Sequence, residues 1–132
     1  MVKKIILSDN HRRTLSSSLI VVEKSLLELE SMILRKSDSC CNILVRDIDD
    51  TTIKNNISAI NEAKQFICEL AEKYGASQEK LSLQRVIDAK RTKIWEILTD
   101  TLSGKIRGYG TFPKKYAEEY DGDIKKLIEI TN

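Results

Sequence analysis

The chain has 132 residues, of which 41% are hydrophobic and 32% charged, and its 22 basic and 20 acidic side chains leave a formal net charge of +2. This composition excludes a disordered polymer, and the near balance of charge excludes a strong overall attraction to nucleic acid or to an anionic membrane. One proline and five glycines are too few for the turns of a β-sandwich or barrel. We therefore expect one helical domain spanning residues 1–132.

The first long helix is predicted to begin near Ser8, because Ser8, Asp9 and Asn10 are all good N-terminal caps. Apolar residues then recur at steps of four and three, the spacing of a helix face that packs against a neighbour. This first stripe comprises Leu15, Leu19, Val22, Leu26, Leu29 and Ile33.

A second apolar stripe repeats every seven residues on the same helix and comprises Ile20, Leu27 and Leu34. At about 100° per residue, it lies roughly a third of a turn from the first stripe. A helix with two apolar stripes needs two neighbours. Either both neighbours belong to the same bundle, or Ile20, Leu27 and Leu34 form the interface of an oligomer.

The second helix is predicted from about residue 50 to residue 74, with Gly75 as its stop. The third is predicted to run from a cap at Ser77 to a stop at Ser103–Gly104. Its apolar residues are Leu83, Val86, Ile87, Ile94, Ile97, Leu98 and Leu102.

The C-terminal part is predicted to hold short helical pieces. Pro113 can start a helix over residues 114–120, because proline is tolerated in a first turn. Asp121–Asp123 should interrupt that helix, and Asp123 should cap a last one. The predicted fold class is therefore all-α, an up-and-down helical bundle of three long helices plus a short C-terminal helical segment.

The loop of residues 104–115 is the strongest candidate for a ligand or partner surface. It combines glycines, basic side chains and aromatic rings without an acidic residue. Basic side chains attract phosphate, and aromatic rings can stack on unpaired bases. The competing interpretation is a turn whose aromatic rings close the end of the bundle. The candidate residues are Lys105, Arg107, Tyr109, Phe112, Lys114 and Lys115.

No set of catalytic or metal-binding residues emerges from the sequence. The single histidine, His11, leaves a histidine-based zinc site or triad hard to assemble, and the adjacent Cys40 and Cys41 lack zinc-ligand spacing. Lys90 lies within the apolar stripe of the third helix, where a lysine usually extends its ammonium to solvent. We assign no catalytic residue, metal or cofactor.

These observations favour a cytoplasmic, non-enzymatic protein-interaction or assembly module, with a protein partner or self-association. No apolar run approaches the roughly 20 residues that cross a bilayer, so no membrane partner is expected. Three cysteines without framework spacing are typical of reduced thiols. The alternative is a small nucleic-acid-binding protein that uses the loop of residues 104–115.

Overall fold

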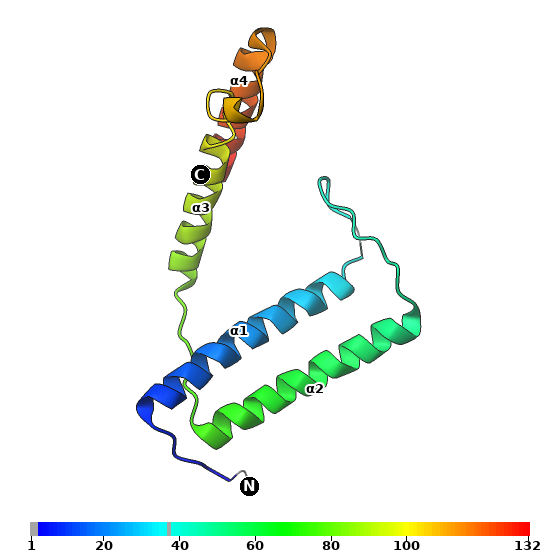
Figure 1. Ribbon diagram of the computed structural model, residues 1–132, viewed down its shortest axis with the longest axis vertical. Coiled ribbons are helices and arrows are strands. Elements are labelled where there is room, and N and C mark those ends of the chain that lie inside the picture. The colour runs from blue at the N-terminus through cyan, green and yellow to red at the C-terminus, as the bar shows by residue number, and fades with distance from the viewer. Residues whose placement is uncertain (1–2, 37) are drawn as a thin grey trace. The chain divides into compact units, whose positions relative to one another are not determined.

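The computed structural model describes residues 3–36 and 38–132. Four α-helices account for most of these residues, α1 (Asp9–Ile33), α2 (Asp50–Tyr74), α3 (Leu83–Thr99) and α4 (Lys114–Thr131), with a short 3-10 helix η1 (Arg107–Tyr109) between the last two (Figure 1). The β-type pairing in the described ranges is one isolated bridge between Ser39 and Asn42. The all-α prediction is confirmed.

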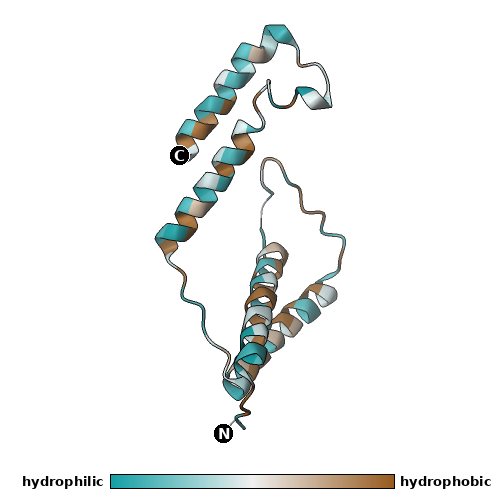
Figure 2. Cartoon of the chain, turned by 60° about the vertical axis from the view of Figure 1, so that its left-hand side comes forward, coloured by the Kyte–Doolittle hydropathy of each residue, from teal (hydrophilic) through white to brown (hydrophobic). Residues whose placement is uncertain are grey.

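The chain divides into two compact units, Met1–Glu79 and Lys80–Asn132. Within the first unit α1 packs against α2, and within the second α3 packs against α4. Figure 2 shows apolar and polar segments alternating along each helix, as expected for helices with one buried side. The union of both units in one bundle stays a prediction.

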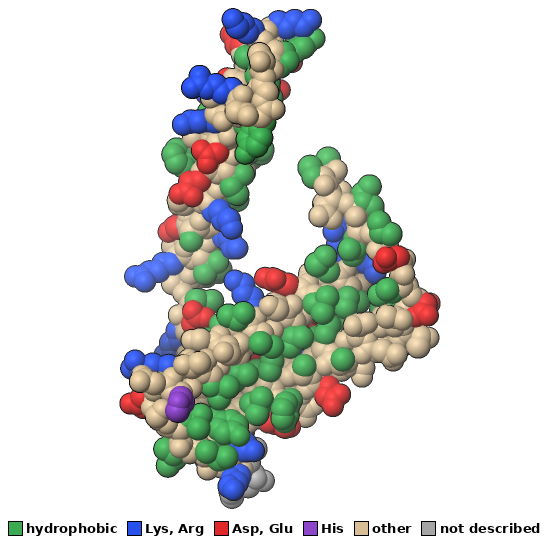
Figure 3. Space-filling model, in the orientation of Figure 1, with side chains coloured by type: hydrophobic (Ala, Val, Ile, Leu, Met, Phe, Trp, Pro, Cys, Tyr) green, Lys and Arg blue, Asp and Glu red, His purple; other side chains and the backbone are tan. Residues whose placement is uncertain are grey.

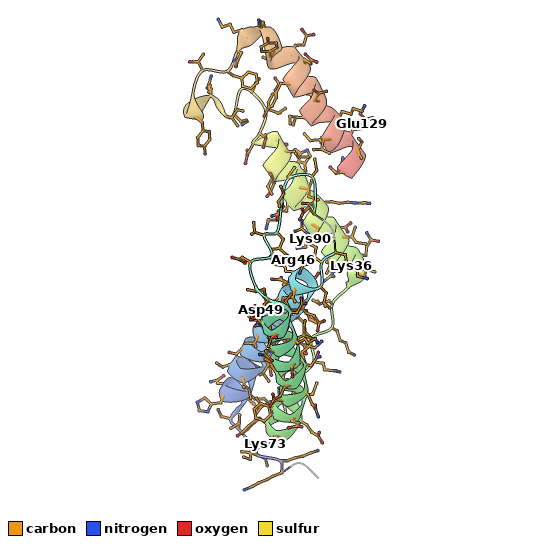
Figure 4. All side chains as sticks on the ribbon, turned by 90° about the vertical axis from the view of Figure 1, so that its right-hand side faces the viewer. Lys36, Arg46, Asp49, Lys73, Lys90 and Glu129 are labelled. Atoms are coloured by element: carbon orange, nitrogen blue, oxygen red, sulfur yellow. The ribbon has the colours of Figure 1, made fainter. Side chains whose placement is uncertain are left out.

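Local capping signals set the ends of α1 and α2. The Ser8 hydroxyl accepts a hydrogen bond from the His11 amide at 3.2 Å. The Asp49 carboxylate, labelled in Figure 4, accepts one from the Thr52 amide at 2.7 Å. Hydrogen bonding to the Thr52 side chain and to the Thr52 backbone amide lowers the pKa of Asp49 below its ordinary value. Gly75 ends α2 with φ of 67°, a left-handed conformation that suits glycine. The predicted start of α1 and both predicted bounds of α2 are confirmed to within about a residue.

The core of the first unit is narrow. Ile60 and Ile67 of α2 are buried, at 3% and 9% exposure, and no other hydrophobic side chain in the described ranges is. At the edge of this contact the Lys64 ammonium lies 2.9 Å from a Glu30 carboxylate oxygen and joins the two helices. Beyond the end of α2, the Ser77 amide donates to the Ser16 hydroxyl at 3.1 Å. One row of side chains on each helix therefore holds the pair together.

The segment between α1 and α2 folds back on the end of α1. The Arg46 guanidinium donates to the backbone carbonyl of Ile33 at 2.9 Å and to that of Arg35, so it satisfies carbonyl groups that the helix end leaves open. Ile43 and Val45, which lie outside any helix, remain 74% and 72% exposed. Apolar exposure thus extends from the helices into this segment.

The second unit departs from the predicted element bounds in three places. The helix α3 ends at Thr99, four residues before the predicted stop at Ser103–Gly104. Ser82, and not Ser77, caps α3, accepting from the Arg85 amide at 3.3 Å. The C-terminal segment is a single helix of 18 residues that continues through Asp121–Asp123, so the predicted interruption is wrong. Packing of half-buried Ile124 and Ile128 outweighs the cost of about 1 kcal/mol for a glycine inside a helix.

A hydrogen-bonded clamp joins the end of α3 to the middle of α4. The Asp121 carboxylate accepts from the Ser103 amide at 2.8 Å and from its hydroxyl at 2.7 Å. These two bonds lower the pKa of Asp121 below its ordinary value. The Tyr120 hydroxyl donates to the Thr101 carbonyl at 2.7 Å. The clamp closes the base of the connection that contains the candidate loop.

Candidate interaction surfaces

The basic residues in the first part of the 104–115 loop lie at the surface, around η1. Lys105 and Arg107 are exposed, and the Tyr109 ring is 94% exposed. Gly110 follows with φ of 141°, a backbone conformation essentially restricted to glycine. The exposed aromatic ring thus lies within four residues of two exposed basic side chains along the chain.

The second aromatic residue of the loop has a structural position. The Phe112 ring packs on the Tyr120 ring with centroids 4.7 Å apart, and its side chain is half-buried. Phe112 is therefore occupied by packing against α4, and whether the loop's aromatic rings close the end of a bundle stays a prediction. Sequence alone could not separate it from Tyr109, because both are aromatic residues among glycines and basic residues.

Lys114 and Lys115 lie in the first turn of α4 and are exposed. The Lys115 ammonium lies 4.8 Å from the centroid of the Tyr116 ring, a cation–π geometry. The six candidate residues thus separate into an exposed group around η1, a packed ring at the loop base and two lysines on α4. Their role as a ligand or partner surface stays a prediction.

The candidate oligomer stripe on α1 is partly accessible. Ile20 is half-buried, whereas Leu27 and Leu34 are 48% and 56% exposed. Leu34 is the C-terminal cap of α1, so the stripe reaches the end of the helix. The α1–α2 contact leaves this side of the helix largely uncovered. Whether another chain covers it stays a prediction.

Sequence reasoning missed how much apolar surface the first stripe of α1 and the stripe of α3 expose. Val22 and Leu29 of the first stripe are 47% and 45% exposed. Every residue from 81 to 97 is exposed, including Leu83 at 74% and Trp95 at 48%. Figure 3 shows hydrophobic side chains along the α1–α2 pair, with acidic and basic side chains toward its edges. Periodicity predicts which residues share a helix face, but it does not predict whether another helix of the same chain packs on that face.

The second unit carries a surface depression along α3. A shallow depression of about 380 Å³ is lined by Asp88, Arg91, Thr92, Trp95 and Asn132, and Lys90 lies outside it, exposed on α3 (Figure 4). No group of three potential metal ligands occurs in the ranges that the structure describes. Among those ranges, no helix has the length and apolarity to span a bilayer.

No protein-family model matches the chain, and no curated protein or solved structure is similar to it. Any functional conclusion therefore rests on the geometry of the exposed surfaces.

Proposed function

We propose that the protein is a non-enzymatic interaction or assembly module. The observation that carries the proposal is the distribution of its hydrophobic residues. Among described residues, 22 large hydrophobic side chains are exposed and only Ile60 and Ile67 are buried. Full burial of one such side chain contributes about 1.5–3 kcal/mol, which is small beside the conformational entropy of ordering two 25-residue helices. Contact with another protein would supply the missing burial.

The total surface supports the same conclusion. The chain exposes 11297 Å², whereas two separate compact units of these sizes would expose about 8,500 Å² together. Part of the excess lies on extended segments, and part lies on the uncovered helix faces. A standard protein interface removes about 800 Å² from each partner, so the excess exceeds what one interface needs.

The test is a tagged pull-down from cytoplasmic lysate of the native host, with and without nuclease, read by mass spectrometry. Wild-type chain should retain a discrete protein partner, or a second untagged copy, after nuclease. Leu27→Glu combined with Leu34→Glu should reduce capture at least about tenfold if their stripe is the contact, because two charges would be buried unpaired. Ile20 stays unchanged in this variant because its half-buried side chain supports the hairpin.

The variant must give the same far-UV circular dichroism spectrum as wild type. A loss of capture then reflects the loss of the contact and not unfolding of the chain. The matched control is Glu23→Gln with Lys24→Gln, which alters exposed polar residues of the same helix. Capture of no protein by wild-type chain under any condition would contradict the interaction module.

The second candidate function is binding of single-stranded nucleic acid by the loop. The specific observation is the Tyr109 ring, 94% exposed between Arg107 and Gly110. An exposed aromatic ring within four residues of two exposed basic side chains suits a base-stacking platform. Only the part of the loop around η1 has this arrangement, because the Phe112 ring is already packed.

For this second function, Tyr109→Ala should weaken binding of a fluorescent oligonucleotide by roughly 5- to 100-fold, the effect of one lost stacking contact of about 1–3 kcal/mol. Lys105→Gln with Arg107→Gln should reduce the salt dependence of binding. Lys125→Gln with Lys126→Gln removes the same charge elsewhere and serves as the control. If the loop variant and the control variant lose the same amount of affinity, binding is a general electrostatic attraction to basic residues and the loop is not a specific site.

A further inference from the structure

The connection between α1 and α2 carries two adjacent thiols. Cys40 and Cys41 are both free and both exposed. They occupy the two central positions of a tight turn, which the bridge between Ser39 and Asn42 closes. In Figure 1 this connection projects as a hairpin beyond the adjoining ends of both helices. The two thiols are therefore accessible to a small solute from the surrounding solvent.

Hydrogen bonds hold the backbone on both sides of the two thiols. The Ser39 amide donates to the Asn42 carbonyl at 3.2 Å, and the Arg35 guanidinium donates to the same carbonyl at 2.7 Å. The Asp38 carboxylate accepts from the Leu44 amide at 3.2 Å. These bonds limit the conformations of the turn before anything binds, so a ligand of both thiols need not supply that order.

Adjacency disfavours an ordinary disulfide between Cys40 and Cys41. The peptide bond that joins them is trans, so their Cα atoms lie about 3.8 Å apart. An ordinary disulfide has Cα atoms about 4.4–6.8 Å apart. Two bonds to an atom placed between the sulfurs span a greater distance than a single sulfur–sulfur bond. The pair is therefore better arranged to chelate such an atom than to form a disulfide.

The third cysteine does not join this pair. Cys68 lies in the C-terminal part of α2, about 27 Å along the helix axis from the first residue of that helix. In the part of the chain that the structure describes, no three histidine, cysteine or carboxylate side chains gather as potential metal ligands. A structural zinc site needs four such ligands. The pair therefore fits a ligand that binds two sulfurs and requires no other protein group.

We propose that Cys40 and Cys41 form a two-thiol binding site for trivalent arsenicals. Thiolates are soft ligands and prefer soft, polarisable acceptors. A trivalent arsenic atom that carries one organic group has two remaining valences, which matches the two thiols. When an arsenoxide binds, two arsenic–sulfur bonds form, and the oxygen of the arsenoxide leaves as water with the two thiol protons. No electron is transferred, so the reaction needs no oxidant or reductant.

The second arsenic–sulfur bond gives the site its affinity. Once one thiol has reacted, its neighbour is held at a high effective concentration, which strengthens binding by about 10²–10⁴-fold over either thiol alone. A lone thiol such as Cys68 lacks this gain, so an excess of a competing monothiol removes the arsenical from it. The site is separate from the proposed interaction surfaces and does not depend on them.

The test uses phenylarsine oxide as the probe and the reduced full chain in excess glutathione. One equivalent should protect two of the three cysteines from a thiol reagent, and native mass spectrometry should find one phenylarsenic group per chain. Cys40→Ser and Cys41→Ser should each raise the Kd at least about 100-fold. Cys68→Ser is the matched control, because it removes an exposed thiol from the same unit and should leave the Kd unchanged.

Three results with this probe would overturn the proposal. They are release of the probe from wild type to glutathione, a Kd for Cys40→Ser equal to that of wild type, and loss of binding in Cys68→Ser. Zinc ions alone test the class of ligand, because two thiols do not complete a zinc site. Zinc should bind wild type no more tightly than Cys40→Ser. Tight zinc binding that requires Cys40 would contradict the assignment to arsenicals.

Discussion

Replacing Ile60 with alanine is expected to lower the free energy of unfolding of the α1–α2 unit by about 2–4 kcal/mol. Ile60 is the most buried hydrophobic residue in the described chain, at 3% exposure, and Ile67 follows two turns later at 9%. Truncating a buried isoleucine removes its burial and leaves a cavity that the two helices can only partly close. Ile67→Ala should have a similar but smaller effect.

Urea denaturation followed by circular dichroism at 222 nm measures this effect, at one fixed protein concentration because self-association would add to stability. Phe66→Ala serves as the control on the same helix. Its ring is larger but 57% exposed, and we expect a loss of about 1 kcal/mol or less. A denaturation midpoint for Ile60→Ala equal to that of wild type would mean that the contact between α1 and α2 does not hold this unit together.

The features that could be predicted from sequence are those with short-range causes. Ser8 as a cap and Gly75 as a stop act within one turn of their helices, so residue type alone identifies them. The apolar stripes of α1 and α2 are likewise readable from spacing. The all-α class follows from the scarcity of turn residues and the length of the periodic segments.

The features that sequence reasoning misses have long-range causes. The Ser77 amide donates to Ser16, 61 residues earlier, and the helix begins instead at the next good cap, Ser82. Asp121 accepts a hydrogen bond from Ser103, which lies 18 residues earlier. Local residue types predict an interruption of the helix at Asp121–Asp123, but α4 continues through these residues. Neither of these long-range hydrogen bonds can be predicted from the local sequence pattern.

The candidate surfaces show the same division. The sequence identifies the 104–115 loop as basic and aromatic, but only the ring contact between Phe112 and Tyr120 separates a packed ring from an exposed one. Likewise, the two stripes of α1 are visible as spacing. The side of α1 that remains exposed is known only from the position of α2.

Gly110→Ala is expected to destabilise the loop by about 1–3 kcal/mol and to disturb the position of the Tyr109 ring. Gly110 has φ of 141°, where an L side chain is strained, and no neighbouring atom lies within 4 Å of the position that an alanine Cβ would take. The cost therefore arises from the backbone alone. Gly108→Ala is the matched control, because its Cβ would also meet nothing within 4 Å and its φ is not in the positive range.

The paired comparison separates backbone strain from loss of flexibility. Gly108→Ala should leave stability unchanged or raise it by up to about 1 kcal/mol, because alanine reduces the conformational freedom of the unfolded chain. Urea denaturation gives the stability of each variant, and Tyr109 amide and ring NMR shifts report the loop itself. If the loop binds nucleic acid through Tyr109, Gly110→Ala should weaken that binding while Gly108→Ala does not. Equal effects of the two substitutions would show that the positive-φ bend at Gly110 is not what positions the ring.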